Sequence, residues 1–126
     1  MRFRQENKLI LLVGGNHFNQ LNISELLTDI YHYSVLISNS EEESLSLMEA
    51  FQPDLVLFDT IHPSTTGRKF LELKQSDLSI KNIPLIVLTS SPKQIDRITA
   101  IDLGAKDCLI HPFGIDSLIK IVQLYL

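Results

Sequence analysis

The chain has 126 residues, a net charge of −4, 44% hydrophobic residues and 21% charged residues, which predicts one globular domain over residues 1–126 with an ordered core over about 8–124. The acidic balance argues against direct binding to nucleic acid, because phosphate contacts require a basic surface. The single cysteine, Cys108, excludes an internal disulfide, and the first apolar run is too short to span a membrane, so we expect a cytoplasmic protein without membrane contact.

The first strand and helix are predicted near the start of the chain. Leu9–Val13 is a continuous apolar run that ends at Gly14-Gly15-Asn16, which is typical of a buried strand followed by a loop. Helical spacing comes next, with Asn22 or an earlier residue as the N-cap. The apolar positions of this helix are Ile23, Leu26, Leu27 and Ile30.

A second strand and helix follow in the same pattern. Tyr33–Ser38 predicts a strand, and Ser40 stands three residues before Glu43, the spacing of a capping box. The helix that this box begins ends before Pro53. Its apolar positions are Leu45, Leu47, Met48 and Phe51.

The third strand delivers a carboxylate to the edge of the sheet. Leu55–Phe58 predicts a strand buried on both faces, and Asp59 stands at its carboxyl end. A short helix is expected over Gly67–Gln75.

The last two strand–helix units complete the alternation. Pro84–Thr89 predicts a buried strand, Ser91 before Pro92 predicts an N-cap, and Gly104 suits a left-handed helix end. The helix between them carries Ile95, Ile98, Ala100 and Ile101. A short strand over Cys108–Ile110 leads through His111-Pro112, whose peptide bond we expect to be cis, into a final helix.

This alternation predicts an α/β fold with three layers and a parallel five-stranded sheet. Buried strands separated by helices imply parallel pairing, and the flavodoxin-like strand order 2-1-3-4-5 is expected. In that order the loop Gly14-Gly15-Asn16 shares a crevice with three side chains at strand ends. These side chains are Asp59, Thr89 and His111.

Several segments match a known family in order and spacing. They are Pro53–Asp59 with Pro63 and Gly67, Pro84–Thr89, and Ala100–Asp107 running into Pro112-Phe113. Over nearly its full length the chain resembles the receiver domain of bacterial two-component response regulators. The resemblance implies that Asp59 accepts a phosphoryl group from a histidine kinase and that the hydroxyl of Thr89 contacts the phosphate.

Four positions depart from the family's pattern. The family has a magnesium-binding acidic pair where this chain has Gly14 and Gly15, a lysine at His111, and an aromatic switch residue at Cys108. Magnesium requires hard oxygen ligands in near-octahedral geometry, and Asp59 with the backbone carbonyl of Ile61 supplies only two. We therefore expect a pseudo-receiver without enzymatic activity that binds Mg²⁺ weakly or not at all, with phosphorylation lost or inefficient.

Other interpretations of the same residues remain open. Asp59 is a working phosphoacceptor if its metal or donor chemistry differs from the family's. In a flavodoxin-like binder, Gly14-Gly15-Asn16 holds a small anionic ligand, and otherwise it is a plain turn. Three histidines near Asp59 are a candidate zinc or nickel set, although scattered surface histidines have the same pattern. They are His17, His62 and His111.

Two further expectations concern charge and packing at the strand ends. If Asp59 pairs with His111, each favours the charged form of the other, and Asp59→Asn should weaken stability where His111 is protonated. Cys108 is otherwise expected to be a small core or half-buried residue.

The expected partners are a histidine kinase or another signalling protein. We expect contact through the last two helices and the strand between them, a surface that also suits a homodimer. Ile95, Ile98, Ile115 and Leu118 belong to these helices. No separate output domain is recognised, and the sequence leaves open whether the chain is a stand-alone regulator or a fragment of a larger protein.

Overall fold

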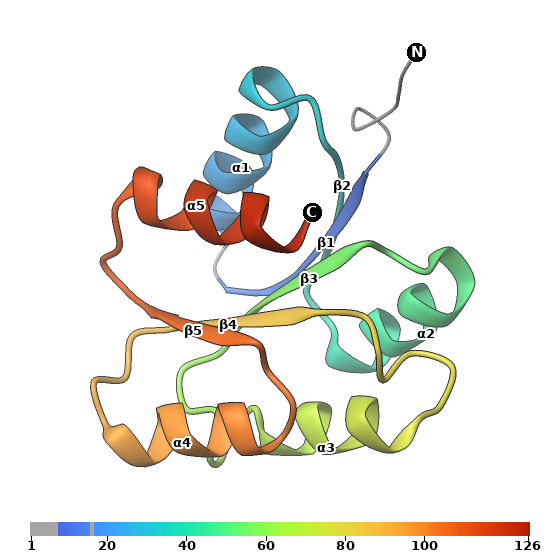
Figure 1. Ribbon diagram of the computed structural model, residues 1–126, viewed down its shortest axis with the longest axis vertical. Coiled ribbons are helices and arrows are strands. Elements are labelled where there is room, and N and C mark those ends of the chain that lie inside the picture. The colour runs from blue at the N-terminus through green and yellow to red at the C-terminus, as the bar shows by residue number, and fades with distance from the viewer. Residues whose placement is uncertain (1–7, 16) are drawn as a thin grey trace.

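The computed structural model describes the backbone of residues 8–15 and 17–126, with side chains over 8–15 and 20–126. A parallel five-stranded sheet in the order β2-β1-β3-β4-β5 forms its centre (Figure 1). The strands are β1 (Leu9–Gly14), β2 (Ser34–Ser38), β3 (Leu55–Asp59), β4 (Leu85–Thr89) and β5 (Asp107–Ile110). The predicted fold class and strand order are confirmed.

Helices cover both faces of the sheet, as Figure 1 shows. One face carries α1 (His17–Glu25), which continues into the π-helical turn η2 (Leu26–Ile30), together with α5 (Ile115–Tyr125). The other face carries α2 (Glu41–Phe51), α3 (Arg68–Ser76) and α4 (Gln94–Asp102). This division makes the three layers that the alternation of strands and helices predicts.

The strands divide the core into two halves because successive side chains point to opposite faces. In β1, Leu11 and Val13 pack toward α2, α3 and α4, whereas Ile10 and Leu12 pack toward α5. All four of these side chains are buried. Burial on both faces is why the strands read as unbroken apolar runs rather than as alternating ones.

Several local predictions are confirmed. Ser40 is the N-cap of α2 and accepts a hydrogen bond from the backbone N–H of Glu43 at 3.1 Å. Gly104 follows α4 with a φ of +102°, in the left-handed region, and the His111–Pro112 peptide bond is cis.

Other local predictions place the start of a helix or strand at the wrong residue. Tyr33 precedes β2, and Asn22 lies inside α1, which begins at His17, so the N-cap of that helix is an earlier residue, as the other alternative allowed. Ser91 does not cap α4, because that helix begins only at Gln94. Its hydroxyl instead accepts a hydrogen bond from Lys93 and donates one to Asp96. Within the described residues, no helix is long and apolar enough to cross a bilayer.

The sheet register brings the candidate site together. Gly14 pairs with Asp59 across β1 and β3, and Asp59 pairs with Leu88 of β4. Thr89 pairs with Ile110 across β4 and β5. The carboxyl ends of β1, β3, β4 and β5 therefore meet at one edge, where sites in open parallel sheets are usually found.

Candidate functional site

Asp59 is the last residue of β3 and lies at the centre of this edge. Its side chain is only 14% exposed. Burial raises the pKa of the Asp59 carboxyl above its usual value, and the neighbouring His111 opposes this shift without overcoming it. The carboxylate is therefore held in a partly enclosed position where ionisation costs more free energy than in water.

The loop after β1 closes directly over Asp59. Gly14 and Gly15 have φ values of +76° and +79°, which side chains other than glycine's rarely adopt. A Cβ at Gly15 would stand 2.9 Å from Oδ2 of Asp59, and one at Gly14 would overlap the carbonyl oxygen of Asp59. Gln20 of α1 fixes the loop by donating to the Gly14 carbonyl. Neither position has room for an acidic side chain with this backbone.

His111 supplies the polar partner of Asp59, as the sequence predicts. Its Nε2 lies 3.1 Å from Oδ2 of Asp59. The ring is held in place by Phe113, at 4.6 Å between ring centroids, and the His111 N–H donates to the Thr89 carbonyl at 2.7 Å. The predicted pair is confirmed, and His111 lowers the pKa of Asp59 as expected, but burial outweighs this contribution and leaves the pKa of Asp59 raised.

Thr89 lies at the expected strand end, but its hydroxyl is directed away from Asp59. Its Oγ1 donates to the carbonyl oxygen of Ile61 at 2.7 Å and accepts from the Ser91 N–H at 3.1 Å. The Ile61 carbonyl is the second oxygen that the sequence offers to a metal. In this structure both candidate oxygens, on Asp59 and Ile61, already accept hydrogen bonds.

Cys108 lies in β5 and packs in the hydrophobic core, not among the side chains at the carboxyl ends of the strands. It is buried, and burial raises the pKa of its thiol, with Arg97 opposing the shift and Asp107 adding to it. A buried thiol with a raised pKa is a poor nucleophile. The interpretation of Cys108 as a small core residue is confirmed.

Asp96 of α4 is a polar centre that sequence reasoning missed. Its side chain is 1% exposed, and it accepts hydrogen bonds from Ser64 N and Oγ at 2.9 and 2.5 Å and from Ser91 Oγ at 2.5 Å. Burial alone would raise the pKa of Asp96, but the hydrogen bonds from Ser64, Ser91 and His62 hold it well below its usual value. This carboxylate ties the β3–α3 loop to the start of α4.

No sequence pattern marks that network, because its members lie far apart in the chain. Ser64 precedes Asp96 by 32 residues, and His62 precedes it by 34. Only the packing of the two loops brings them together. A weak signal exists in Asp96 itself, a carboxylate in the first turn of a helix, where negative charge is favoured.

His62 and His111, two of the three histidines of the candidate metal set, have different carboxylate partners. Nδ1 of His62 lies 3.2 Å from Asp96, whereas His111 lies beside Asp59. Among the side chains that the structure describes, no three acidic, histidine or cysteine groups gather in a way that could hold a metal ion. The side chain of His17 lies outside the described residues.

The last two helices and β5 present apolar side chains to solvent. Of the four residues singled out in the sequence, Ile95, Ile98 and Ile115 are exposed, whereas Leu118 is buried against the sheet. Ile101 and Ile110 add to the exposed set. The surface formed by the five exposed isoleucines is called the isoleucine face below.

Comparisons with known proteins agree with this geometry. A family model described as "Response regulator receiver domain" matches residues 10–123. The chain is 31% identical to the transcriptional regulatory protein CpxR of Klebsiella pneumoniae, over 95% of this chain and 49% of that protein. It is 32% identical to a probable transcriptional regulator, ycf27, of Cyanophora paradoxa, over 86% of this chain and 44% of the relative.

Solved structures show the same architecture. The chemotaxis protein CheY4 of Vibrio cholerae superposes with a TM-score of 0.83 at 24% identity, covering 94% of this chain and 98% of that one. The receiver domain of the sensor histidine kinase PA1611 of Pseudomonas aeruginosa is 27% identical, with a TM-score of 0.81 over 94% and 97% of the two chains. That domain holds a magnesium ion in its active-site cleft.

The present chain spans less than half the length of the first curated relatives that it matches, with 44% and 49% of the two regulators covered. A region of the hybrid signal transduction histidine kinase D of Dictyostelium discoideum is also similar, at 29% identity over 92% of this chain and 7% of the kinase. Similar segments therefore occur both in regulators and in a kinase.

Proposed function

Because the chain belongs to the response regulator receiver domain family, we propose that it is a pseudo-receiver of two-component systems, a signalling module that acts through protein contacts with phosphorylation of Asp59 lost or inefficient. One observation carries this proposal. The Gly14-Gly15 loop, in a conformation that only glycine adopts readily, closes over Asp59 where an acidic pair would hold a metal.

The residues present do not fit a magnesium ion. Mg²⁺ requires near-octahedral oxygen ligands at about 2.0–2.1 Å and usually takes one or two carboxylates from the protein. Here one buried carboxylate pairs with His111, and the Ile61 carbonyl accepts from Thr89. The other carboxylate oxygen of Asp59 and the second lone pair of the Ile61 carbonyl could still face a cation, but neither adds a second carboxylate, so we expect weak binding or none.

The loss of cations bears directly on phosphoryl transfer. The reaction depends on positioning and on positive charge that stabilises the transferring group. Among the ion pairs of the described residues, the candidate cation beside Asp59 is the imidazole of His111, and an imidazole is a weaker base than the ammonium group of a lysine. Losing about 3–4 kcal/mol of transition-state stabilisation slows a reaction by several hundredfold, at about 1.4 kcal/mol per tenfold.

The partner is expected to be a histidine kinase or another signalling protein. The isoleucine face supports contact through α4, β5 and α5, because clustered apolar side chains on a surface mark interaction sites. Direct binding to nucleic acid is not expected for a chain with a net charge of −4. The chain is not expected to be an enzyme.

Treatment with a small acyl phosphate tests the proposal. The chain is incubated with the donor and excess Mg²⁺, and its intact mass is followed beside that of Asp59→Asn. We expect no adduct of about 80 Da, the mass of one phosphoryl group, on either protein. If the dissociation constant for Mg²⁺ is about 10 mM or weaker, as we expect, 10 mM Mg²⁺ should raise the free energy of unfolding by no more than about 0.4 kcal/mol.

Rapid formation of the adduct on the wild-type chain and its loss in Asp59→Asn would instead establish a working phosphoacceptor. The flavodoxin-like alternative, an anionic ligand at the Gly14-Gly15 loop, predicts thermal stabilisation by that ligand. It is less favoured, because Oδ2 of Asp59 lies directly beneath Gly15 and its charge opposes an anion.

A further inference from the structure

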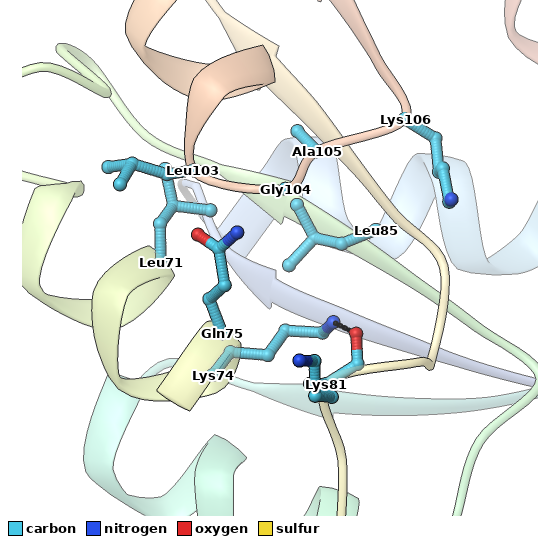
Figure 2. Close-up of a pocket in the computed structure, with 9 residues that line it drawn as sticks. All are labelled: Leu71, Lys74, Gln75, Lys81, Leu85, Leu103, Gly104, Ala105 and Lys106. Carbon is cyan, nitrogen blue, oxygen red and sulfur yellow. Dashed lines mark hydrogen bonds between the residues drawn. The ribbon is translucent and has the colours of Figure 1, made fainter. Parts of the chain in front are cut away.

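A pocket of about 170 Å³ lies near the amino ends of β4 and β5, whereas Asp59 lies at the carboxyl end of β3 (Figure 2). It is bounded by α3, by the start of β4 and by the segment that enters β5. Leu71, Leu85 and Leu103 provide apolar walls, and three lysines also line it. These are Lys74, Lys81 and Lys106.

Lys74 is the unusual member of this set. It lies in the last turn of α3 and is only 6% exposed, whereas Lys81 and Lys106 are exposed. Its Nζ donates to the backbone carbonyl of Lys81 at 3.2 Å, the contact drawn as a dashed line in Figure 2. An ammonium group carries three donors, so this single bond leaves it only partly satisfied.

The charge of Lys74 has no acidic partner within the described residues. None of the ion pairs found there, within 4.0 Å, includes Lys74, Lys81 or Lys106. Buried charges in proteins are normally paired, because removing an ion from water is costly. Here the neighbouring charge, on Lys106, has the same sign. Burial, and to a smaller extent Lys106, together lower the pKa of Lys74 to about 8.

The dimensions of the pocket limit what can neutralise this charge. A volume of about 170 Å³ corresponds to roughly six water molecules, at about 30 Å³ each. Pockets for nucleotides or drug-sized ligands are larger, at about 300–1,000 Å³. The three leucines would bury an aliphatic group favourably, whereas a fully polar anion would gain nothing from them.

We propose that this pocket binds a small carboxylate with a short aliphatic chain, about the size of butyrate. The carboxylate accepts hydrogen bonds from the Lys74 ammonium and is attracted by the charges of Lys81 and Lys106. The aliphatic chain packs against Leu71, Leu85 and Leu103. This site is remote from Asp59 and does not depend on whether Asp59 is phosphorylated.

Binding should depend on pH in a defined direction. The only titratable groups lining the pocket are Lys74, Lys81 and Lys106, and all three are cationic at neutral pH. Because the pKa of Lys74 is lowered to about 8, its charge is lost first as the pH rises. Affinity for the carboxylate should therefore fall about tenfold between pH 7 and pH 9.

An amide chemical-shift titration of the ¹⁵N-labelled chain with sodium butyrate, at constant ionic strength, tests the site. We expect saturable shifts around residues 71–75, 85 and 103–106, with a dissociation constant of the order of millimolar. Acetate should bind roughly tenfold more weakly, because each methylene contributes about fourfold. Inorganic phosphate should bind no better than acetate.

Two lysine variants locate the binding. Lys74→Met replaces the buried ammonium with an apolar side chain of similar length and should weaken butyrate binding at least tenfold. Lys69→Met, an exposed residue of the same helix, removes the same charge and should leave binding unchanged. Lys106→Gln, also exposed, should weaken binding severalfold and provides the test if Lys74→Met fails to fold.

A different pattern would overturn the proposal. Unchanged butyrate affinity in both Lys74→Met and Lys106→Gln would do so, as would equal affinities for butyrate, acetate and phosphate. The absence of saturable shifts in the wild-type chain would mean that Lys74 serves only to bond the Lys81 carbonyl. None of these outcomes bears on the acyl phosphate test, so the two proposals fail independently.

Discussion

At the scale of single residues, Asp59 shows how burial and one neighbouring side chain set the ionisation of a carboxylate. In a site with a metal, positive charge would favour its ionised form. Here the carboxyl has a loop of two glycines above it and one imidazole beside it. Burial therefore dominates and raises its pKa, so that the ionised form is a cost to the folded state at neutral pH.

The first prediction is the effect of Asp59→Asn on stability. A raised pKa means that the folded state binds the proton more tightly than the unfolded chain. The contribution of Asp59 to the free energy of unfolding therefore falls as the pH rises through and above 3.8. Asp59→Asn should therefore increase the free energy of unfolding at pH 8, by about 1 kcal/mol.

Denaturant unfolding at several pH values measures this effect, with Asp116→Asn as the matched control. Asp116 is an exposed acid in the first turn of α5, and its replacement should change stability by only a few tenths of a kcal/mol. A loss of stability in Asp59→Asn at pH 8 would show instead that the pair with His111 outweighs burial. The original expectation from the sequence would then be restored.

At the scale of elements, the β1–α1 loop and the strands differ in how far the sequence determines them. Unbroken apolar runs such as Leu9–Val13 are typical of strands that are buried on both faces of a parallel sheet. The strands and their order could therefore be predicted. The loss of acidic side chains at Gly14 and Gly15 was equally visible. Their left-handed backbone and its contact with Asp59 depend on tertiary packing, which no local pattern encodes.

The failures of prediction have the same physical origin. Ser91 and Pro92 have the composition of a helix start, but the buried Asp96 takes the Ser91 hydroxyl as a donor and the helix begins later. Lys74 reads as an ordinary solvent-facing lysine, since a lysine is almost never buried without a partner. Their hydrogen-bond partners, Asp96 and Lys81, are only five and seven residues away in the chain, but the burial that gives these contacts their importance comes from tertiary packing.

The Gly14-Gly15 loop can be tested by a substitution that adds a side chain to it. Restoring an acid by Gly15→Asp should lower the free energy of unfolding by about 2 kcal/mol. A left-handed backbone costs a residue with a Cβ about 1–2 kcal/mol, and the new carboxylate would stand against Asp59. Because the loop cannot accept the side chain without moving, this single change should not create a magnesium site.

Gly114→Ser is the control for that variant. Gly114 caps α5 with a φ of −78°, and a Cβ there would meet no atom within 4 Å. Serine is a good N-cap, so this variant should be at least as stable as the wild-type chain. Unfolding in denaturant, with and without Mg²⁺, compares the three proteins. Millimolar Mg²⁺ affinity in a fully stable Gly15→Asp protein would contradict the closed loop described above.

At the scale of the whole molecule, the fold separates three surfaces. The carboxyl edge of the sheet carries Asp59, the opposite edge carries the lysine-lined pocket, and the isoleucine face lies on the β5 side. Because β5 is the edge strand, α4 and α5 flank a margin of the sheet that no further strand of the described chain covers. This margin is open to contact with other proteins whether or not Asp59 is phosphorylated.

The last prediction is that the isoleucine face forms a symmetric homodimer. Closed two-fold assemblies use the same patch on both subunits, and five exposed isoleucines over α4, β5 and α5 provide a patch of that kind. We expect sedimentation velocity to detect dimer at about 100 μM chain, a weak association typical of a small interface.

Ile98→Lys should shift the equilibrium to monomer, because pairing by two-fold symmetry brings two like charges into one desolvated contact. Leu78→Lys makes the same change at a residue that is 84% exposed between α3 and β4, and it should leave the dimer intact. A monomer at every concentration, or equal effects of the two lysine variants, would restrict the isoleucine face to contacts with a different protein.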